Sequence, residues 1–149
     1  MGYDLSAHTV GITNVFLNDA TLLAALGGTG DGVSQERLYD TKAIQNPTFP
    51  YAVFQFIGSI TERTFGTIVE LAEWQFSMFH QDLDSPLDKT TINALFNKLT
   101  DAYDDAEATM TVAGYSVTWV TRGASFFLPT EDKTQQLTTI YSIRTEKAR

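Results

Sequence analysis

Apolar residues repeat along this chain with two different periods, one helical and one of alternating strands. The clearest helical period lies in residues 85–106. Before it, Ser85, Pro86 and Asp88 have the composition of a helix start: a hydroxyl cap, a proline in the first turn and an acid facing the free N–H groups. We therefore predict one long helix whose apolar stripe covers a sheet. The stripe consists of Ile92, Leu95, Phe96, Leu99 and Tyr103.

A weaker helical pattern opens the chain. Asp4 is suited to cap a first helix, although Gly11 interrupts its apolar stripe. Asp19 is suited to cap a short second helix over residues 20–26, which Gly27 would end. We predict two helical pieces at the start.

A glycine-rich segment, residues 27–35, follows these helices. The more specific of two interpretations of its glycines is a phosphate-binding loop. Such loops follow a strand, open a helix and end in Gly-Lys-Ser/Thr, and none of these conditions holds here. We interpret the segment as an ordinary loop.

The alternating segments predict strands. Residues 37–40 form a short strand, 41–50 are irregular because of two prolines, and a long strand over 51–62 turns back near residues 65–67. Alternate residues of three of these strands should face the core. They are Ala52, Phe54, Phe56 and Ile60 in residues 51–62, Ala72, Trp74, Phe76 and Met78 in residues 71–81, and Leu137, Thr139, Tyr141 and Ile143 in the last strand.

Between the long helix and the last strand, we predict a tight hairpin of residues 108–112 and 115–122 around Ala113 and Gly114. The run then continues to Leu128 and turns through residues 129–134. The whole pattern predicts a single α+β domain over residues 1–149. Its mainly antiparallel sheet of about four to five strands would pack against one long helix, with short helices at the N-terminus.

The composition excludes several kinds of site and partner. The chain has no cysteine, which excludes disulfides and thiolate metal sites. Its net charge is −8, and its basic residues are scattered, which argues against wrapping nucleic acid. Residues 43–61, the longest charge-free stretch, contain two prolines and cannot be a membrane-spanning helix. The start lacks the pattern of a signal peptide, so we expect the chain to remain in the compartment where it is made.

The segment HQDLDSPLD, residues 80–88, is the one dense group of potential ligands. An EF-hand loop starting at Asp82 fails, because Pro86 and Leu87 stand where an oxygen ligand and the turning glycine are needed. A base and its orienting carboxylate, His80 with Asp82, would lack a recognisable nucleophile. A metal or charge contact at an interface is a further alternative. We favour a structural role and expect no catalytic residue, metal or cofactor.

Three consecutive apolar residues, Phe126, Phe127 and Leu128, lie beside the turn of residues 129–134. They cannot all point into a core on one side of a sheet, so at least one should face a partner. A strand buried on both faces is the alternative interpretation.

The order of these segments resembles the tail-terminator, or tail-completion, proteins of long-tailed bacteriophages. The matching features span nearly the whole chain, and their order and spacing carry the resemblance. They are LLAALGG followed by RLYD, FPYAVFQFIGS, EWQFSMFHQD before a helix ending KLTDAYDD, and a closing strand introduced by EDKTQQLTTIYSI. The GTGDG insertion and the longer loop before Asn46 depart from the compact family pattern.

The resemblance implies a non-enzymatic virion protein at the head-tail joint, assembled in the host cytoplasm. Its homo-oligomer would be a six-membered ring on the tail tube protein that stops tube growth and offers its other face to the head-tail connector. Genome DNA would pass through the lumen without specific binding, aided by acidic residues if these line the lumen; solvated outer faces are the alternative place for them. A head-completion or neck protein is a second interpretation, and a small ligand-binding or enzymatic domain is a third.

Overall fold

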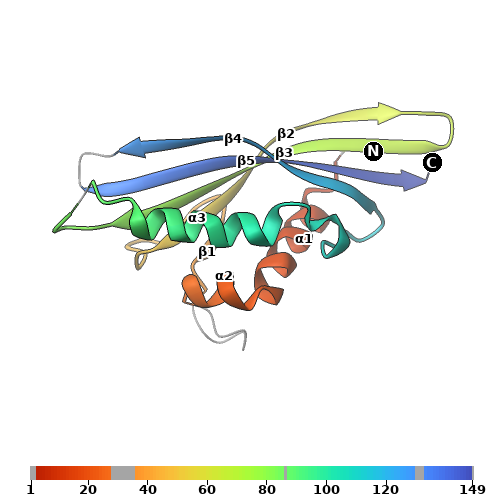
Figure 1. Cartoon of the computed structure of the whole chain (residues 1–149). Coiled ribbons are helices and arrows are strands. Elements are labelled where there is room, and N and C mark those ends of the chain that lie inside the picture. Colours follow the sequence, from red (N-terminus) through yellow and green to blue (C-terminus); the bar gives the residue numbers. More distant parts are fainter. Residues whose placement is uncertain (1–2, 28–35, 86, 130–132, 149) are drawn as a thin grey trace.

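A computed structural model describes residues 3–27, 36–85, 87–129 and 133–148. It is an α+β fold in which the helices lie on one side of a five-stranded sheet (Figure 1). The elements, in chain order, are α1 (Leu5–Asn18), α2 (Ala20–Ala25), β1 (Leu38–Asp40), β2 (Tyr51–Arg63), β3 (Thr67–Gln81), α3 (Thr90–Tyr103), the 3-10 helix η1 (Ala106–Ala108), β4 (Ser116–Pro129) and β5 (Thr134–Ala148).

The strand order in the sheet is β1-β2-β3-β5-β4. The short β1 runs parallel to β2, and the other neighbouring pairs are antiparallel. The predicted α+β class is therefore confirmed, and the sheet is mixed, with the parallel β1–β2 pair beside the antiparallel pairs of the predicted, mainly antiparallel arrangement. The helical layer differs from the prediction, because α1 and α3 each have 14 residues and only α2 is short.

The core lies between the helices and one face of the sheet. Strand alternation places the four predicted β3 residues there, from Ala72 to Met78, all fully buried. The predicted β5 face also packs inward, with Leu137 at its margin. Tyr103 of α3 reaches across this core, and its hydroxyl donates a hydrogen bond of 2.8 Å to the Ile12 carbonyl oxygen of α1. The two long helices are thereby joined to each other as well as to the sheet.

The caps of the first two helices form as predicted. The Asp4 carboxylate accepts from the Ala7 N–H at 3.0 Å, and the Asp19 carboxylate accepts from the Leu22 N–H at 2.9 Å. Gly27 follows α2 with a φ of +75°, the left-handed backbone that favours glycine after a helix. The rest of the predicted glycine loop, residues 28–35, lies outside the described residues.

The start of the long helix was predicted five residues too early. Asp82 accepts from the Asp84 and Ser85 N–H groups and forms a turn, and Asp88 accepts from the Thr90 N–H and hydroxyl. Extending the helix backward would put Asp88 and Lys89 on the buried stripe, four and three residues before Ile92. Ser85 is therefore no helix cap, and Pro86 lies outside the described residues.

Of the hairpin predicted from residues 108–112 and 115–122, the turn around Ala113 and Gly114 forms, but the first strand does not. Ala108 ends η1, and the ladder contact of the residues after it is a single bridge between Val112 and Tyr115. Met110 and Val112 are buried in the core instead. A β-carbon on Gly11 would lie 2.8 Å from the Thr111 carbonyl oxygen, so the glycine that weakens the α1 pattern lets this segment approach the helix.

A β-bulge in β2 places the Ile60 side chain on the sheet face opposite to the predicted one. The register shifts between Phe56 and Gly58, so Ile60 pairs with Leu71 rather than with a core residue of β3. Ile60 is consequently on the uncovered face and 63% exposed. The prediction that it shares the core face with Phe54 was wrong because one extra residue inverts the alternation.

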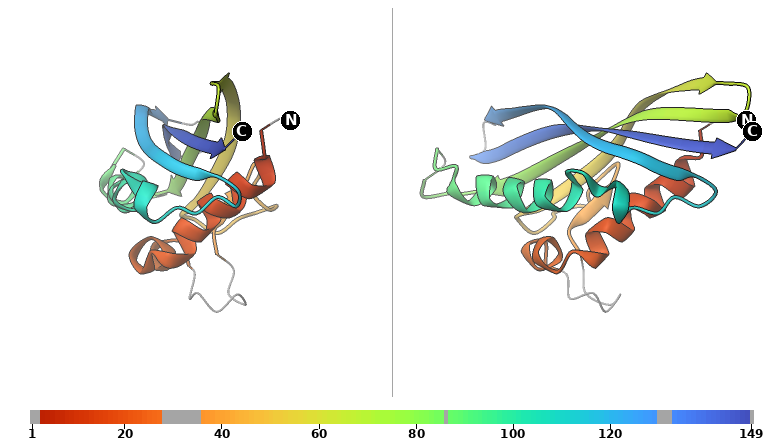
Figure 2. Two further views of the ribbon diagram at one scale, coloured as in Figure 1. Left: turned by 90° about the vertical axis from the view of Figure 1, so that its right-hand side faces the viewer. Right: turned by 45° about the vertical axis from the view of Figure 1, so that its right-hand side comes forward.

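The sheet extends beyond its helical layer. The turn that joins β2 to β3 lies at the end of the sheet near the C-terminus, past the first turn of α1 (Figures 1 and 2). The face opposite the helices is covered by no other element in the described part of the chain (Figure 2). The described part of the chain therefore leaves one sheet face and one hairpin end open.

Candidate functional site

The dense polar segment of residues 80–88 does not converge on a site. His80 is half-buried near the end of β3, opposite Gln135 of β5. Asp82 and Asp88 have their carboxylates in the local turns described above. Hydrogen bonds from Thr90 hold the pKa of the exposed Asp88 carboxyl below its usual value. Across the described ranges, no group of three or more His, Cys, Asp or Glu side chains is placed to hold a metal ion.

The second histidine lies in a buried polar cluster between α1 and the sheet. His8 is 1% exposed, and its ring nitrogens contact the Asp4 carbonyl oxygen at 2.7 Å and the Thr145 hydroxyl at 3.1 Å. Burial lowers its pKa, against the opposing effect of Asp4 and Glu70. Tyr3 covers the ring, with centroids 4.1 Å apart. This arrangement fixes the start of α1 onto β5 and holds the imidazole away from solvent.

The predicted interface residues divide between the two sheet faces. Phe127 pairs with the core-facing Leu137, and the Lys89 ammonium lies 4.6 Å from its ring centroid. Phe126 and Leu128 project to the uncovered face and are 41% and 43% exposed. Of the three, two are thus available to a partner, and the third packs toward α3.

The uncovered face continues from these residues as an aromatic row. Leu128 pairs with Gln136, which pairs with Phe79, and Phe79 stacks on Tyr51 with ring centroids 4.8 Å apart. A shallow hollow of about 300 Å³ adjoins this row and is lined by the loop after β1 and by several glutamines. Its open shape offers contact area rather than an enclosed pocket for a small molecule.

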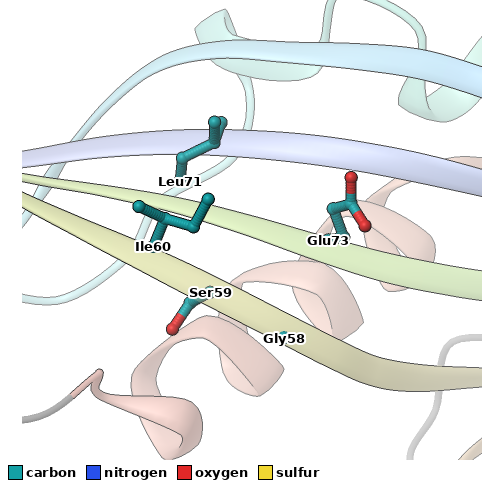
Figure 3. A pocket seen from close by; sticks show the side chains of 5 residues that line it. All are labelled: Gly58, Ser59, Ile60, Leu71 and Glu73. Carbon is teal, nitrogen blue, oxygen red and sulfur yellow. The ribbon is translucent and has the colours of Figure 1, made fainter.

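A second apolar region occupies the hairpin end of the same face. A hollow of about 280 Å³ is lined by Gly58, Ser59, Ile60, Leu71 and Glu73. The side chains of Ile60, Leu71 and Glu73 rise on one side of the strands, whereas Ser59 points away (Figure 3). Phe65 in the turn beyond is 103% exposed.

Sequence reasoning missed this hairpin end. The available signal was a phenylalanine in a tight turn, where glycine, asparagine or aspartate is usual. Nothing in the sequence indicates the hollow, because it depends on the bulge that turns Ile60 outward.

Neither a family model nor a curated protein sequence matches this chain. Among solved structures, a chain from the virion of a native gene transfer agent (GTA) particle is similar, with a TM-score of 0.71 at 13% sequence identity. The similarity covers 97% of this chain and 99% of that chain. At this identity the two proteins share a fold.

No helix in the described part of the chain is long and apolar enough to span a bilayer.

Proposed function

We propose that this chain is a structural virion protein, specifically a tail-terminator subunit that caps the head-proximal end of a phage tail tube. The observation that carries the proposal is the end-to-end fold similarity to a chain of a GTA virion. The order of sequence segments supports the narrower assignment, because it resembles the tail-terminator family over the same length.

Assembly into a ring fits the surfaces of the protomer. One sheet face is uncovered, and large apolar side chains are exposed at both of its ends. Contiguous apolar surface on a soluble protein is typical of a protein–protein interface. A head-to-tail contact between different surfaces closes into a ring when its rotation fits, and we propose a homohexamer. Of the predicted interface residues Phe126, Phe127 and Leu128, we keep the exposed Phe126 and Leu128 as the proposed contacts at the β4 end.

The ring would bind one partner on each of its two faces and would enclose a lumen through which DNA passes. One face would bind the tail tube protein, and the other would bind the head-tail connector or stopper. Residues 82–107 around α3 carry seven acids against two lysines, and we place this segment at the lumen. There it would repel DNA phosphates and let the genome pass without specific binding. The role is non-enzymatic, and the protein would reside in the virion after assembly in the host cytoplasm.

Electron microscopy of the purified chain, with and without tail tubes, tests this function. We expect ring-shaped particles at one end of each tube. Particles that ignore tubes would contradict the assignment.

A head-completion or neck subunit is the second candidate, since the similar chain belongs to a whole virion. Its partner would be the head. Binding to tail-free heads but not to tubes would favour this candidate over a tail terminator.

A further inference from the structure

The turn between β2 and β3 carries a phenylalanine whose side chain is not packed against the rest of the fold. Phe65 is fully exposed, although the turn around it is well defined. The Thr64 N–H donates to the Thr67 carbonyl oxygen at 2.9 Å, and the Thr67 N–H donates to the Thr64 hydroxyl at 3.1 Å. Phe65 is therefore held on a fixed turn at the end of two paired strands.

The hollow described above lies on the side of the same hairpin (Figure 3). A β-carbon on Gly58 would meet nothing within 4 Å, so its floor is open. Ile60 and Leu71 provide apolar walls, and Glu73 stands at the rim. Lining of this kind suits one apolar side chain with a positive charge near it.

The hairpin cannot fill its own hollow. Gly58 and Phe65 are separated by seven residues of nearly continuous strand, roughly 20 Å at the rise of an extended chain. Because β2 and β3 pair up to Arg63 and Ile68, the tip cannot fold back. A molecule that fills the hollow must therefore come from outside this hairpin.

Charge favours a second copy of this chain as that molecule. Arg63, two residues before Phe65, is exposed, and Glu73 at the hollow is also exposed. Within the described residues, the ion pairs are Arg122–Asp104 and Arg144–Glu146, so neither side chain has an ionic partner in the protomer. The tip thus offers an aromatic ring beside a cation, and the hollow offers apolar walls beside an anion.

We propose that the β2–β3 tip of one copy docks in the hollow of the next copy, with Phe65 against Ile60 and Leu71 and Arg63 toward Glu73. The contact deepens the proposed function, because it supplies the joint between neighbouring subunits of the ring. Tip and hollow are different surfaces, so the contact is heterologous and repeats from copy to copy.

Charge reversal tests the contact on the purified full chain. Arg63→Glu or Glu73→Arg alone should weaken self-association, measured by sedimentation, by about tenfold or more, and the double variant should recover most of the loss. Lys98→Glu and Asp101→Arg on α3 are the matched controls and should change nothing. Single variants that associate like the parent would overturn the proposal.

Disulfide trapping provides a second test that does not depend on strong association. Because the chain has no cysteine, Gly66→Cys and Gly58→Cys introduce the only thiols, and each glycine has open space at its β-carbon. Mixed under oxidising conditions, these variants should form a heterodimeric disulfide in large excess over Gly66→Cys mixed with Asn97→Cys, an exposed α3 position. Equal yields would overturn the proposal.

The two proposals can fail separately. Rings that cap tubes without trapping between Gly58 and Gly66 would overturn this contact and leave the capping function intact. The other outcome is a dimer in which the tip of each copy docks in the hollow of the other and whose stability depends on the charges of Arg63 and Glu73. Such a dimer would support the contact and contradict the ring.

Discussion

Replacing His8 with phenylalanine should remove most of the pH dependence of folding near neutrality. The imidazole is buried, and its Nδ1 lies 2.7 Å from the Asp4 carbonyl oxygen. Since a carbonyl can only accept, Nδ1 carries the proton. The Nε2 atom of the neutral ring then accepts from the Thr145 hydroxyl at 3.1 Å. Protonation would reverse the role of Nε2 and place a charge in the core.

The sign of the effect follows from the pKa of His8. Burial holds this pKa below the unfolded value of about 6.5 in spite of nearby Asp4 and Glu70. The rings of Tyr3 and Tyr115 pack around the imidazole without offering it a charge. The unfolded chain therefore binds the proton more tightly. Stability from neutral His8 is fully present above about pH 6.5 and is lost as pH falls toward the folded pKa.

The magnitude at neutral pH follows from the contacts. His8→Phe removes two hydrogen bonds of about 0.5–1.5 kcal/mol each and leaves the buried Thr145 hydroxyl without this partner. We expect a loss of about 2–3 kcal/mol in the free energy of unfolding. Urea denaturation at about pH 7.5 and about pH 5.5 measures both effects.

The parent should lose stability between these pH values, and His8→Phe should lose much less. Tyr103→Phe, which also removes a buried hydrogen bond but leaves His8 in place, is the control and should keep the parental dependence. A His8→Phe variant that keeps the full pH dependence, or that is as stable as the parent at neutral pH, would contradict this role of His8.

Three further predictions follow. Tyr103→Phe should lower the free energy of unfolding by about 1 kcal/mol, because it removes the hydrogen bond to the Ile12 carbonyl; unchanged urea midpoints would contradict this. Gly11→Ala should destabilise by about 1–3 kcal/mol despite alanine's better helix propensity, since its β-carbon would press on the Thr111 carbonyl; a raised melting temperature would show that the segment yields. Phe126→Asp should stay folded by circular dichroism but fail to form rings in light scattering; intact rings would remove this residue from the interface.

Features decided within a few residues were predictable from the sequence. The Asp4 and Asp19 caps need only a short polar side chain before a helix, and both form. Alternation placed Trp74 and Tyr141 in the core, and it separated Phe126 from Phe127. Each of these outcomes follows from the period of the local backbone.

Features decided by tertiary contacts were not predictable. Residues 108–112 have the composition of a strand, but burial of Met110 beside α1 prevails over their β-propensity. The bulge beside Gly58 adds one residue to β2 and turns Ile60 outward, an event that alternation cannot signal. The hollow at the hairpin end was missed for the same reason. The division of the Phe126–Leu128 run between the two sheet faces could be anticipated, whereas the chemistry of a partner for its exposed residues could not.

The decisive measurement is the growth of tail tubes from purified tube protein in the presence of this chain. We propose that the exposed surfaces of this protein, rather than a reactive centre, perform its task. Tube growth should therefore stop, and each tube should carry one ring of this chain at its end. Tubes that lengthen at the same rate, with the chain remaining unbound in solution, would contradict it.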